Sequence, residues 1–598
     1  MRKPWYFDAL LALFFLIQVH LSSAQQPATV LVIEGGTLID GHGGMPVRDA
    51  LIVVQGNRIA TVGHKGQVAY PPNAQIIRGD GKYILPGLWD CQVSTGWYYG
   101  ELMLNHGVTS TCDVGIGYEL AVPHREAIFH GKIRGARPFT GIAFIASNPG
   151  RRGTGLETPL TPSLVPKSAE DAREMVKIRI AAGADYIIFQ DGGLPAEYYR
   201  AAIDEARKSG KPVFTRASGP VLGAKEAASW GAAALPHARG VGPAVAKDPS
   251  KWNNDLDRYA DMDDSKAAEL IRLLVQNRVA LTPALNHNAP AYPKDWSRFE
   301  AEDRRLFSDP DLLAYFPKLH LEILWANYKT QDRGEVRERR RKGFQNALRF
   351  HKMFVEAGGR LLAGGDTNES HAPGLNLHHE MQVFAEAGIP PMNIILSATK
   401  WPAETLGVQD RLGTLEAGKL ADILIVNKDP LQDVRNLQDI EAVIFDGKIV
   451  DRTYHAGFGD PFLMDAGDSP AVEALPWVLS LKQATFRAGG GGAAPDPVEA
   501  PQPGIETISP LMVTAGSPTT TLTLKGFNFV RRSRVYFDGG SVPYRLVTPT
   551  ELQVTLDENH LRRAGRFDIV VMNPEPIATP EWGNGTSNKA HLIVNYKH

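Results

Sequence analysis

The chain has 598 residues, of which 43% are hydrophobic and 22% are charged, and its formal net charge is −2. A chain this long exceeds what one hydrophobic core supports, so we expect two to four domains. The near-neutral charge balance gives no basis for nucleic acid or an anionic membrane surface as a partner.

The N-terminus has the pattern of a secretory signal peptide. Arg2 and Lys3 precede an apolar run at residues 9–17, and small residues at 22–24 offer a cleavage site. A membrane anchor is the rival interpretation, but the run is shorter than the roughly 20 apolar residues that span a bilayer. We therefore predict export to the periplasm or the extracellular space, with cleavage after Ala24 and no transmembrane segment in the mature chain.

Only two cysteines occur, Cys91 and Cys112. Two are too few for a disulfide framework or a cysteine-based metal site. They fall on neighbouring predicted strands, so a disulfide and a pair of buried thiols both remain open.

Short strands open the mature chain, and alternating strands and helices follow. Residues 29–85 have the turns and the period-two pattern of a small β-unit. The alternation after residue 86 is typical of a parallel sheet with crossover helices. We expect strands two to eight at residues 108–113, 138–143, 186–190, 213–217, 233–237, 280–284 and 361–366. The fold class is therefore α/β, a (β/α)8 TIM barrel with its site at the carboxyl ends of the strands and a helical insertion at about 240–360.

Two segments carry a resemblance to a known family. Residues 85–94 run through a Pro-Gly turn into a strand on which Gln92 and Ser94 share one face. Residues 412–422 end in Gly-Lys-Leu-Ala-Asp before a strand at 423–426. Both segments closely resemble signatures of the amidohydrolase superfamily, in its imidazolonepropionase-like and prolidase-like members. The resemblance implies a hydrolase whose barrel is flanked by a composite β-sandwich.

The C-terminal part has a different character. Residues 488–503 are rich in Gly, Ala and Pro, which is typical of a flexible linker. The short strands and turns beyond it resemble a TIG/IPT immunoglobulin-like domain, which we interpret as an attachment or spacing module. The expected order is a signal peptide at 1–24, a composite β-sandwich at 29–85 and 408–452, a barrel at 86–407, an extension at 453–487, the linker, and the TIG/IPT domain at 504–598.

The resemblance also implies where metal ligands stand in relatives. The His-x-His, lysine, two histidine and aspartate positions of the family are occupied here by Gln92, Ser94, Ile188, Arg216, His237 and Asp366. Too few donors remain for two ions, and the fixed cation of Arg216 opposes a metal nearby. We therefore predict no binuclear centre, and either no cofactor or a single divalent metal such as zinc, weakly held by His237 and Asp366.

These substitutions lead to a predicted site. Asp366 and His237 are the predicted catalytic residues, and Arg216 is expected within salt-bridge or water-bridged reach of Asp366, because a buried carboxylate needs a partner. His287 and His371 offer further metal ligands, although we favour loop histidines without that role. His379 fits either a substrate contact or a capped helix start. The predicted substrate-binding residues are Gln92, Ser94, Arg216, Asn286 and His379.

Two functions are compatible with this pattern. The first is an exported amidohydrolase-type hydrolase that acts on C–N bonds, such as those of dipeptides or cyclic amides. The second is a catalytically silent barrel that binds a small molecule or serves as an envelope scaffold. In either case the partner is a small molecule, with possible surface or protein attachment through the TIG/IPT domain, and the sequence does not identify the substrate.

Overall fold

The structure is a computed structural model that describes residues 30–114, 120–147, 165–291, 296–329, 333–368, 370–463, 502–573 and 586–597. The predicted signal peptide, nearly all of the predicted linker and most of the extension at 453–487 lie outside these residues. Across the described ranges, no helix has the length and apolar character needed to cross a bilayer.

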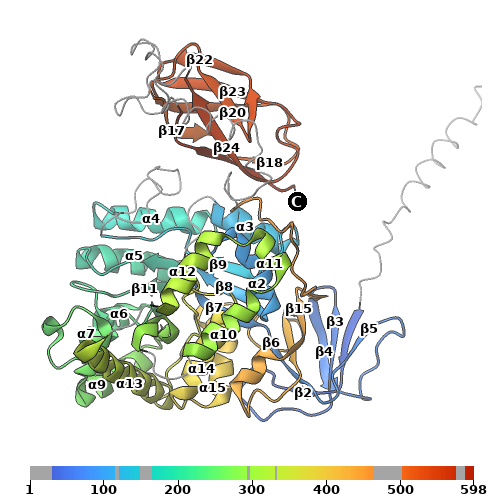
Figure 1. Ribbon diagram of the computed structural model, residues 1–598, viewed down its shortest axis with the longest axis vertical. Coiled ribbons are helices and arrows are strands. Elements are labelled where there is room, and N and C mark those ends of the chain that lie inside the picture. Colours follow the sequence, from blue (N-terminus) through green and yellow to red (C-terminus); the bar gives the residue numbers. More distant parts are fainter. Residues whose placement is uncertain are drawn as a thin grey trace, which may run out of the picture.

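The α/β region is built on two parallel sheets (Figure 1). The first contains β7 (Leu88–Val93), β8 (Val108–Asp113) and β9 (Arg137–Thr140). The second contains β10 (Ile187–Phe189), β11 (Val213–Thr215), β12 (Ala234–Pro236) and β13 (Ala280–Thr282), in that order. These strands lie where the sequence predicts the first seven, although most are shorter than predicted because their last residues leave the ladder.

The eighth predicted strand, at 361–366, does not form a continuous ladder. Isolated parallel bridges join Leu361 to Leu281 of β13 and Thr367 to Val93 of β7. Between them, the side chain of Asp90 accepts hydrogen bonds from the Gly365 backbone at 2.9 Å and the Thr367 hydroxyl at 2.8 Å. Side-chain hydrogen bonds thus replace part of the ladder between the first and last segments of the barrel region.

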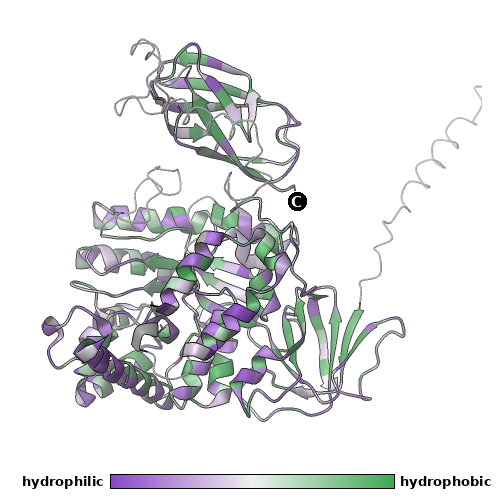
Figure 2. Ribbon diagram, in the orientation of Figure 1, coloured by the Kyte–Doolittle hydropathy of each residue, from purple (hydrophilic) through white to green (hydrophobic). Residues whose placement is uncertain are grey.

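Helices cover the sheets and form the insertion (Figure 1). Ser168 caps α4 (Ala169–Ala181) by accepting from the Asp171 backbone, as the capping pattern predicts. The following helices are α5 (Ala196–Lys208), α9 (Asp264–Gln276), α10 (Trp296–Leu306), α11 (Pro310–Tyr315), α12 (Lys318–Lys329), α13 (Gly334–Glu356) and α14 (Leu375–Glu386). In Figure 2 the strands are mostly green and α13 is mostly purple. Residues 335–338 of α13 are exposed, whereas Arg339 pairs with Asp257 at 2.8 Å.

Strands that precede and follow the α/β region in the sequence together form a separate β-unit. One sheet has the order β4-β3-β1-β5, from β4 (Arg58–His64), β3 (Ala50–Gln55), β1 (Val30–Glu34) and β5 (Gln75–Arg78). The other sheet has the order β16-β15-β14-β6-β2, from β16 (Lys448–Ile449), β15 (Ile440–Phe445), β14 (Ile423–Val426), β6 (Tyr83–Pro86) and β2 (Thr37–Leu38). The antiparallel pairing of β14 with β6 returns the chain to its N-terminal part.

The C-terminal domain is all β. Its two sheets have the orders β17-β19-β23-β22 and β18-β25-β24-β20-β21, and they enclose a separate apolar core. These strands are β17 (Gly504–Ser509), β18 (Met512–Thr514), β19 (Thr520–Phe527), β20 (Arg534–Phe537), β21 (Gly540–Val542), β22 (Tyr544–Thr548), β23 (Glu551–Leu556), β24 (Gly565–Met572) and β25 (Ala590–Asn595). Within the described residues, a small apolar cluster joins Ile593 and Tyr596 of this domain to Ile128, Ile133 and Phe462.

We expect limited proteolysis to release this domain intact. Its core is separate from that of the barrel region, and residues 488–503 have a linker composition. A protease at low concentration should cut within 488–503 and leave two stable fragments, identified by mass spectrometry. A first cut inside the barrel region, or an unfolded C-terminal fragment, would contradict the assignment.

Candidate functional site

Four residues at the carboxyl ends of neighbouring strands have an unusual backbone conformation. Ala217, His237, Ala284 and Asp366 adopt φ values of 42°, 57°, 48° and 52°, a region that favours glycine. Such strain costs about 1–3 kcal/mol per residue and concentrates at functional sites. The end of the sheets where a barrel carries its site is therefore also where the chain stores strain.

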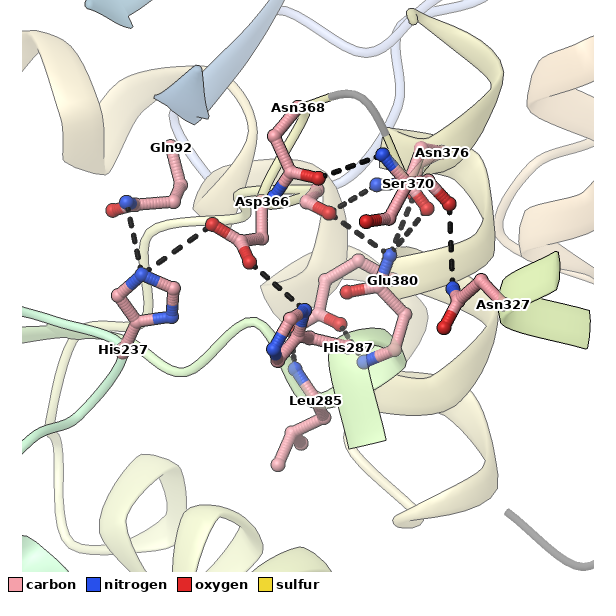
Figure 3. Close-up of polar contacts among 12 residues, drawn as sticks. Gln92, His237, Leu285, His287, Asn327, Asp366, Asn368, Ser370, Asn376 and Glu380 are labelled. Atoms are coloured by element: carbon pink, nitrogen blue, oxygen red, sulfur yellow. Dashed lines mark hydrogen bonds and ion pairs between the residues drawn. The ribbon is translucent and has the colours of Figure 1, made fainter. Parts of the chain in front are cut away.

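The Asp366 carboxylate is the centre of the site (Figure 3). Its Oδ2 lies 3.0 Å from Nδ1 of His287, and its Oδ1 lies 3.3 Å from Nε2 of His237. Nε2 of His237 also lies 3.2 Å from the amide nitrogen of Gln92. Asp366 and His237 are nearly buried, whereas the side chain of His287 keeps 48% of its exposure. The carboxylate thus has an imidazole on each oxygen, and one imidazole faces the solvent.

The pKa values of the two histidines are shifted in opposite directions from the usual value for histidine. Burial lowers the pKa of His237 to about 3, so this ring is neutral. The hydrogen bond to Asp366 raises the pKa of His287, because the carboxylate stabilises the imidazolium. Burial opposes ionisation of Asp366, yet the neighbouring imidazoles outweigh it and hold the pKa of this carboxyl well below its usual range. The site therefore contains an ionised carboxylate paired with a titratable, solvent-facing histidine.

Two further buried acids bind the backbone next to Asp366 and next to His287. Asp90 binds the Gly365 backbone and the Thr367 hydroxyl on either side of Asp366. Glu380 accepts from the backbone nitrogens of Leu285 at 2.9 Å and Asn286 at 2.8 Å, just before His287 (Figure 3). Burial raises the pKa of Asp90 to about 7 and that of Glu380 to about 8. These carboxyls fix the segments that carry Asp366 and His287.

Of the predicted substrate-binding residues other than Arg216, three lie close to Asp366 or His237 and one does not. Gln92 contacts His237, and Ser94 follows β7 with its backbone nitrogen bonded to Thr367. Asn286 directs its amide nitrogen to Gly365 and Asn376 and braces the segment that carries Asp366. His379 lies away from this group, inside α14, where it binds Glu302 at 3.0 Å and stacks on Phe299. Because α14 begins at Leu375, the interpretation of His379 as a helix start is wrong.

The salt bridge predicted between Arg216 and Asp366 is not formed among the described residues. Both oxygens of Asp366 are occupied by imidazoles, and the Arg216 guanidinium lies over the ring of Phe144, 5.5 Å from its centroid. The charge of Arg216 still reaches the site, since after burial it adds to the lowering of the pKa of His237. His287, which the sequence places in a loop and which we expected not to bind a metal, contacts Asp366 directly.

Ile188 and Gln92 occupy two of the positions at which the family resemblance implies metal ligands. Ile188 packs in an apolar cluster with Tyr186 and Phe214, and Gln92 presents an amide. In the part of the chain that the structure describes, no group of three or more His, Cys, Asp and Glu side chains is placed to hold a metal ion.

Comparison with known proteins identifies the family. Residues 100–450, more than half of the chain, match the model of the amidohydrolase family, and residues 503–589 match that of the IPT/TIG domain. The chain belongs to the amidohydrolase family. Its barrel region is therefore that of an amidohydrolase-family hydrolase, followed by a TIG domain as the sequence predicts.

Relatives of this amidohydrolase-family chain include curated and solved proteins. Ochratoxinase of Aspergillus niger is 25% identical over 450 residues, which cover 70% of this chain and 85% of the relative. A Xaa-Pro dipeptidase solved with bound methionine has a TM-score of 0.52 at 23% identity, over 71% of this chain and all of its own. A prolidase-like structure from Bifidobacterium longum has a TM-score of 0.51 at 22% identity, over 71% of this chain and 95% of its own. At these identities, the two structures support the fold alone.

Proposed function

We propose that the protein is an exported hydrolase of amide-type C–N bonds. In this proposal, the two parallel sheets act as one (β/α)8 barrel and the reaction takes place at Asp366. The observation that carries the proposal is the pairing of the Asp366 carboxylate with His287, whose ring faces the solvent. Export rests on the signal-peptide pattern at residues 1–24.

The chemistry follows from the two imidazoles. His287 donates from Nδ1 to Asp366, which leaves its Nε2 directed away from the carboxylate to take a proton from an attacking water. Asp366 fixes the ring and stabilises the imidazolium that forms. His237 is neutral, and its Nε2 lies beside both Oδ1 of Asp366 and the side-chain amide of Gln92 at the inner wall of the site. His287 can then return the proton that it took from the water to the departing nitrogen.

A second candidate function is ligand binding without catalysis. The observation that favours it is the donor set, because Gln92, Ser94, Ile188 and Arg216 stand where the family carries ligands. A single divalent metal such as zinc, weakly held by His237 and Asp366 alone, would also bear on the hydrolase proposal, because it could activate the water in place of an imidazole. Metal analysis and an activity screen separate these cases.

We expect the purified, chelator-free protein to hydrolyse at least one amide and to contain fewer than two metal equivalents. The screen should include dipeptides, N-acyl amino acids, cyclic amides and, after the relative's name, ochratoxin, each with and without a chelator. Elemental analysis gives the metal content of the same sample. Two equivalents of zinc or manganese per chain would refute the prediction on metal content. Saturable ligand binding with no turnover of any amide would favour the silent barrel.

A further inference from the structure

A small cavity lies next to the candidate site, beside His371. It lies among α10, α12, α14 and the segment around residue 371. The cavity has room for about one water molecule or one ammonium group. Trp296, Asn327 and Ser370 at its edge keep partial exposure. The rings of His371 and His287 are 5.6 Å apart, so this cavity is a neighbour of the reacting group.

Three buried side chains on the cavity wall have polar atoms that find no hydrogen-bond partner among the residues that the structure describes. These atoms are Oδ1 of Asp303, Oδ1 of Asn286 and both ring nitrogens of His371. Asp303 is 1% exposed, Asn286 is 3% exposed and His371 is 5% exposed. Buried polar atoms are nearly always paired, so each of these needs an explanation.

The unpaired atoms are mainly acceptors. A neutral imidazole has one ring nitrogen that carries a lone pair, so His371 can offer one acceptor to the cavity. The carboxylate oxygen of Asp303 and the amide oxygen of Asn286 supply two more acceptors. Three acceptors match the three N–H groups of a primary ammonium, whereas a water donates only two hydrogen bonds.

The charge and the walls of the cavity also suit a cation. Burial raises the pKa of Asp303 to about 6, which still leaves this carboxyl largely ionised at neutral pH. Tyr328 donates to its other oxygen at 2.6 Å, and the ring of Trp296 lies 4.5 Å from that of Tyr328. Phe299 also lines the space. Aromatic faces attract small cations, and a buried carboxylate needs a compensating charge.

We propose that this cavity binds an ammonium-sized cation, supplied either by a primary ammonium group of the substrate or by a free monovalent cation. The substrate source rests on the proposed function and narrows it to amides that carry an amino group close to the bond that is cleaved, such as dipeptides. His371 and Asn286 link the cavity to His287, so a bound amino group orients the adjacent amide.

The test is a thermal-shift titration of the full chain, which requires no turnover. Glycinamide hydrochloride, methylammonium chloride and potassium chloride are compared with N-acetylglycinamide and tetramethylammonium chloride at matched ionic strength. We expect glycinamide and methylammonium to raise the Tm by about 1–2 °C at tenfold excess over Kd, and the last two compounds to leave it unchanged. Asp303→Asn should abolish the shift. Glu300→Gln, on the same helix but paired with Arg304, should retain it.

Crystals soaked in thallium(I), an ammonium-sized cation, give a measurement that needs no variant. An anomalous peak beside Oδ1 of Asp303 supports the proposal even if Asp303→Asn fails to fold. A shift with potassium but not with glycinamide assigns the site to a free cation and overturns the substrate source. The absence of both a shift and a peak overturns the proposal as a whole. Hydrolysis without a shift refutes only this inference, and a shift without hydrolysis refutes only the proposed function.

Discussion

Replacing Asp366 by Asn should reduce kcat/KM for any amide substrate by about 10²–10⁴-fold, the range that a positioned general base contributes. Asn keeps the shape of the side chain and removes its charge. His287 then loses the anionic acceptor for its Nδ1–H, and the ring is no longer held in the tautomer that leaves Nε2 basic. Steady-state kinetics on the substrate found in the screen give the measurement.

The pH profile distinguishes this role from a structural one. Because the general base acts in its neutral form, the wild-type rate should rise as pH passes upward through the raised pKa of His287. Without the carboxylate that pKa falls, so the rising limb of the variant should move to lower pH. A matched control is Asp460→Asn, which alters another buried Asp–His pair, to His124 at 3.0 Å. Equal losses in both variants, with an unmoved limb, would refute the role of Asp366.

Much of the fold is readable from the sequence because its signals are local. The strand at 108–113, the capped helix after Ser168 and the short strands beyond residue 504 each carry their own periodicity and turn residues. The eighth strand differs, since its backbone is bound partly by the side chain of Asp90, 275 residues away. The pattern of residues 361–366 alone therefore does not predict that Asp90 binds this segment.

The site was only partly predictable for the same reason. The family resemblance places Asp366, His237 and Gln92 at strand ends, and the structure brings these three together. His287 is positioned by a turn that Glu380 holds from 94 residues away, so its sequence neighbourhood gives no sign of the contact. For Arg216, the strand position was inferred but the direction of a long side chain was not. The signal available for His287 was a histidine close behind a predicted barrel strand.

A buried ion pair connects the barrel region to the β-unit. Arg137 of β9 donates to Asp422 at 2.6 Å, and both side chains are almost fully buried. The second oxygen of Asp422 accepts from the Asp446 backbone. The guanidinium also lies 5.0 Å from the ring centroid of Phe445. Asp422 is the last residue of the Gly-Lys-Leu-Ala-Asp segment, so this pair gives that motif a structural role.

Replacing Arg137 by Ala should lower the free energy of unfolding by about 3–5 kcal/mol, because it leaves the Asp422 charge buried without its partner. Urea unfolding followed by tryptophan fluorescence measures the change. Arg349→Ala is the matched control, since its pair with Asp264 is exposed and screened by water, so its loss should change the stability far less. The double variant Arg137→Met with Asp422→Asn removes both charges and should recover part of the loss. Equal effects of Arg137→Ala and Arg349→Ala would show that the joint is held by apolar packing instead.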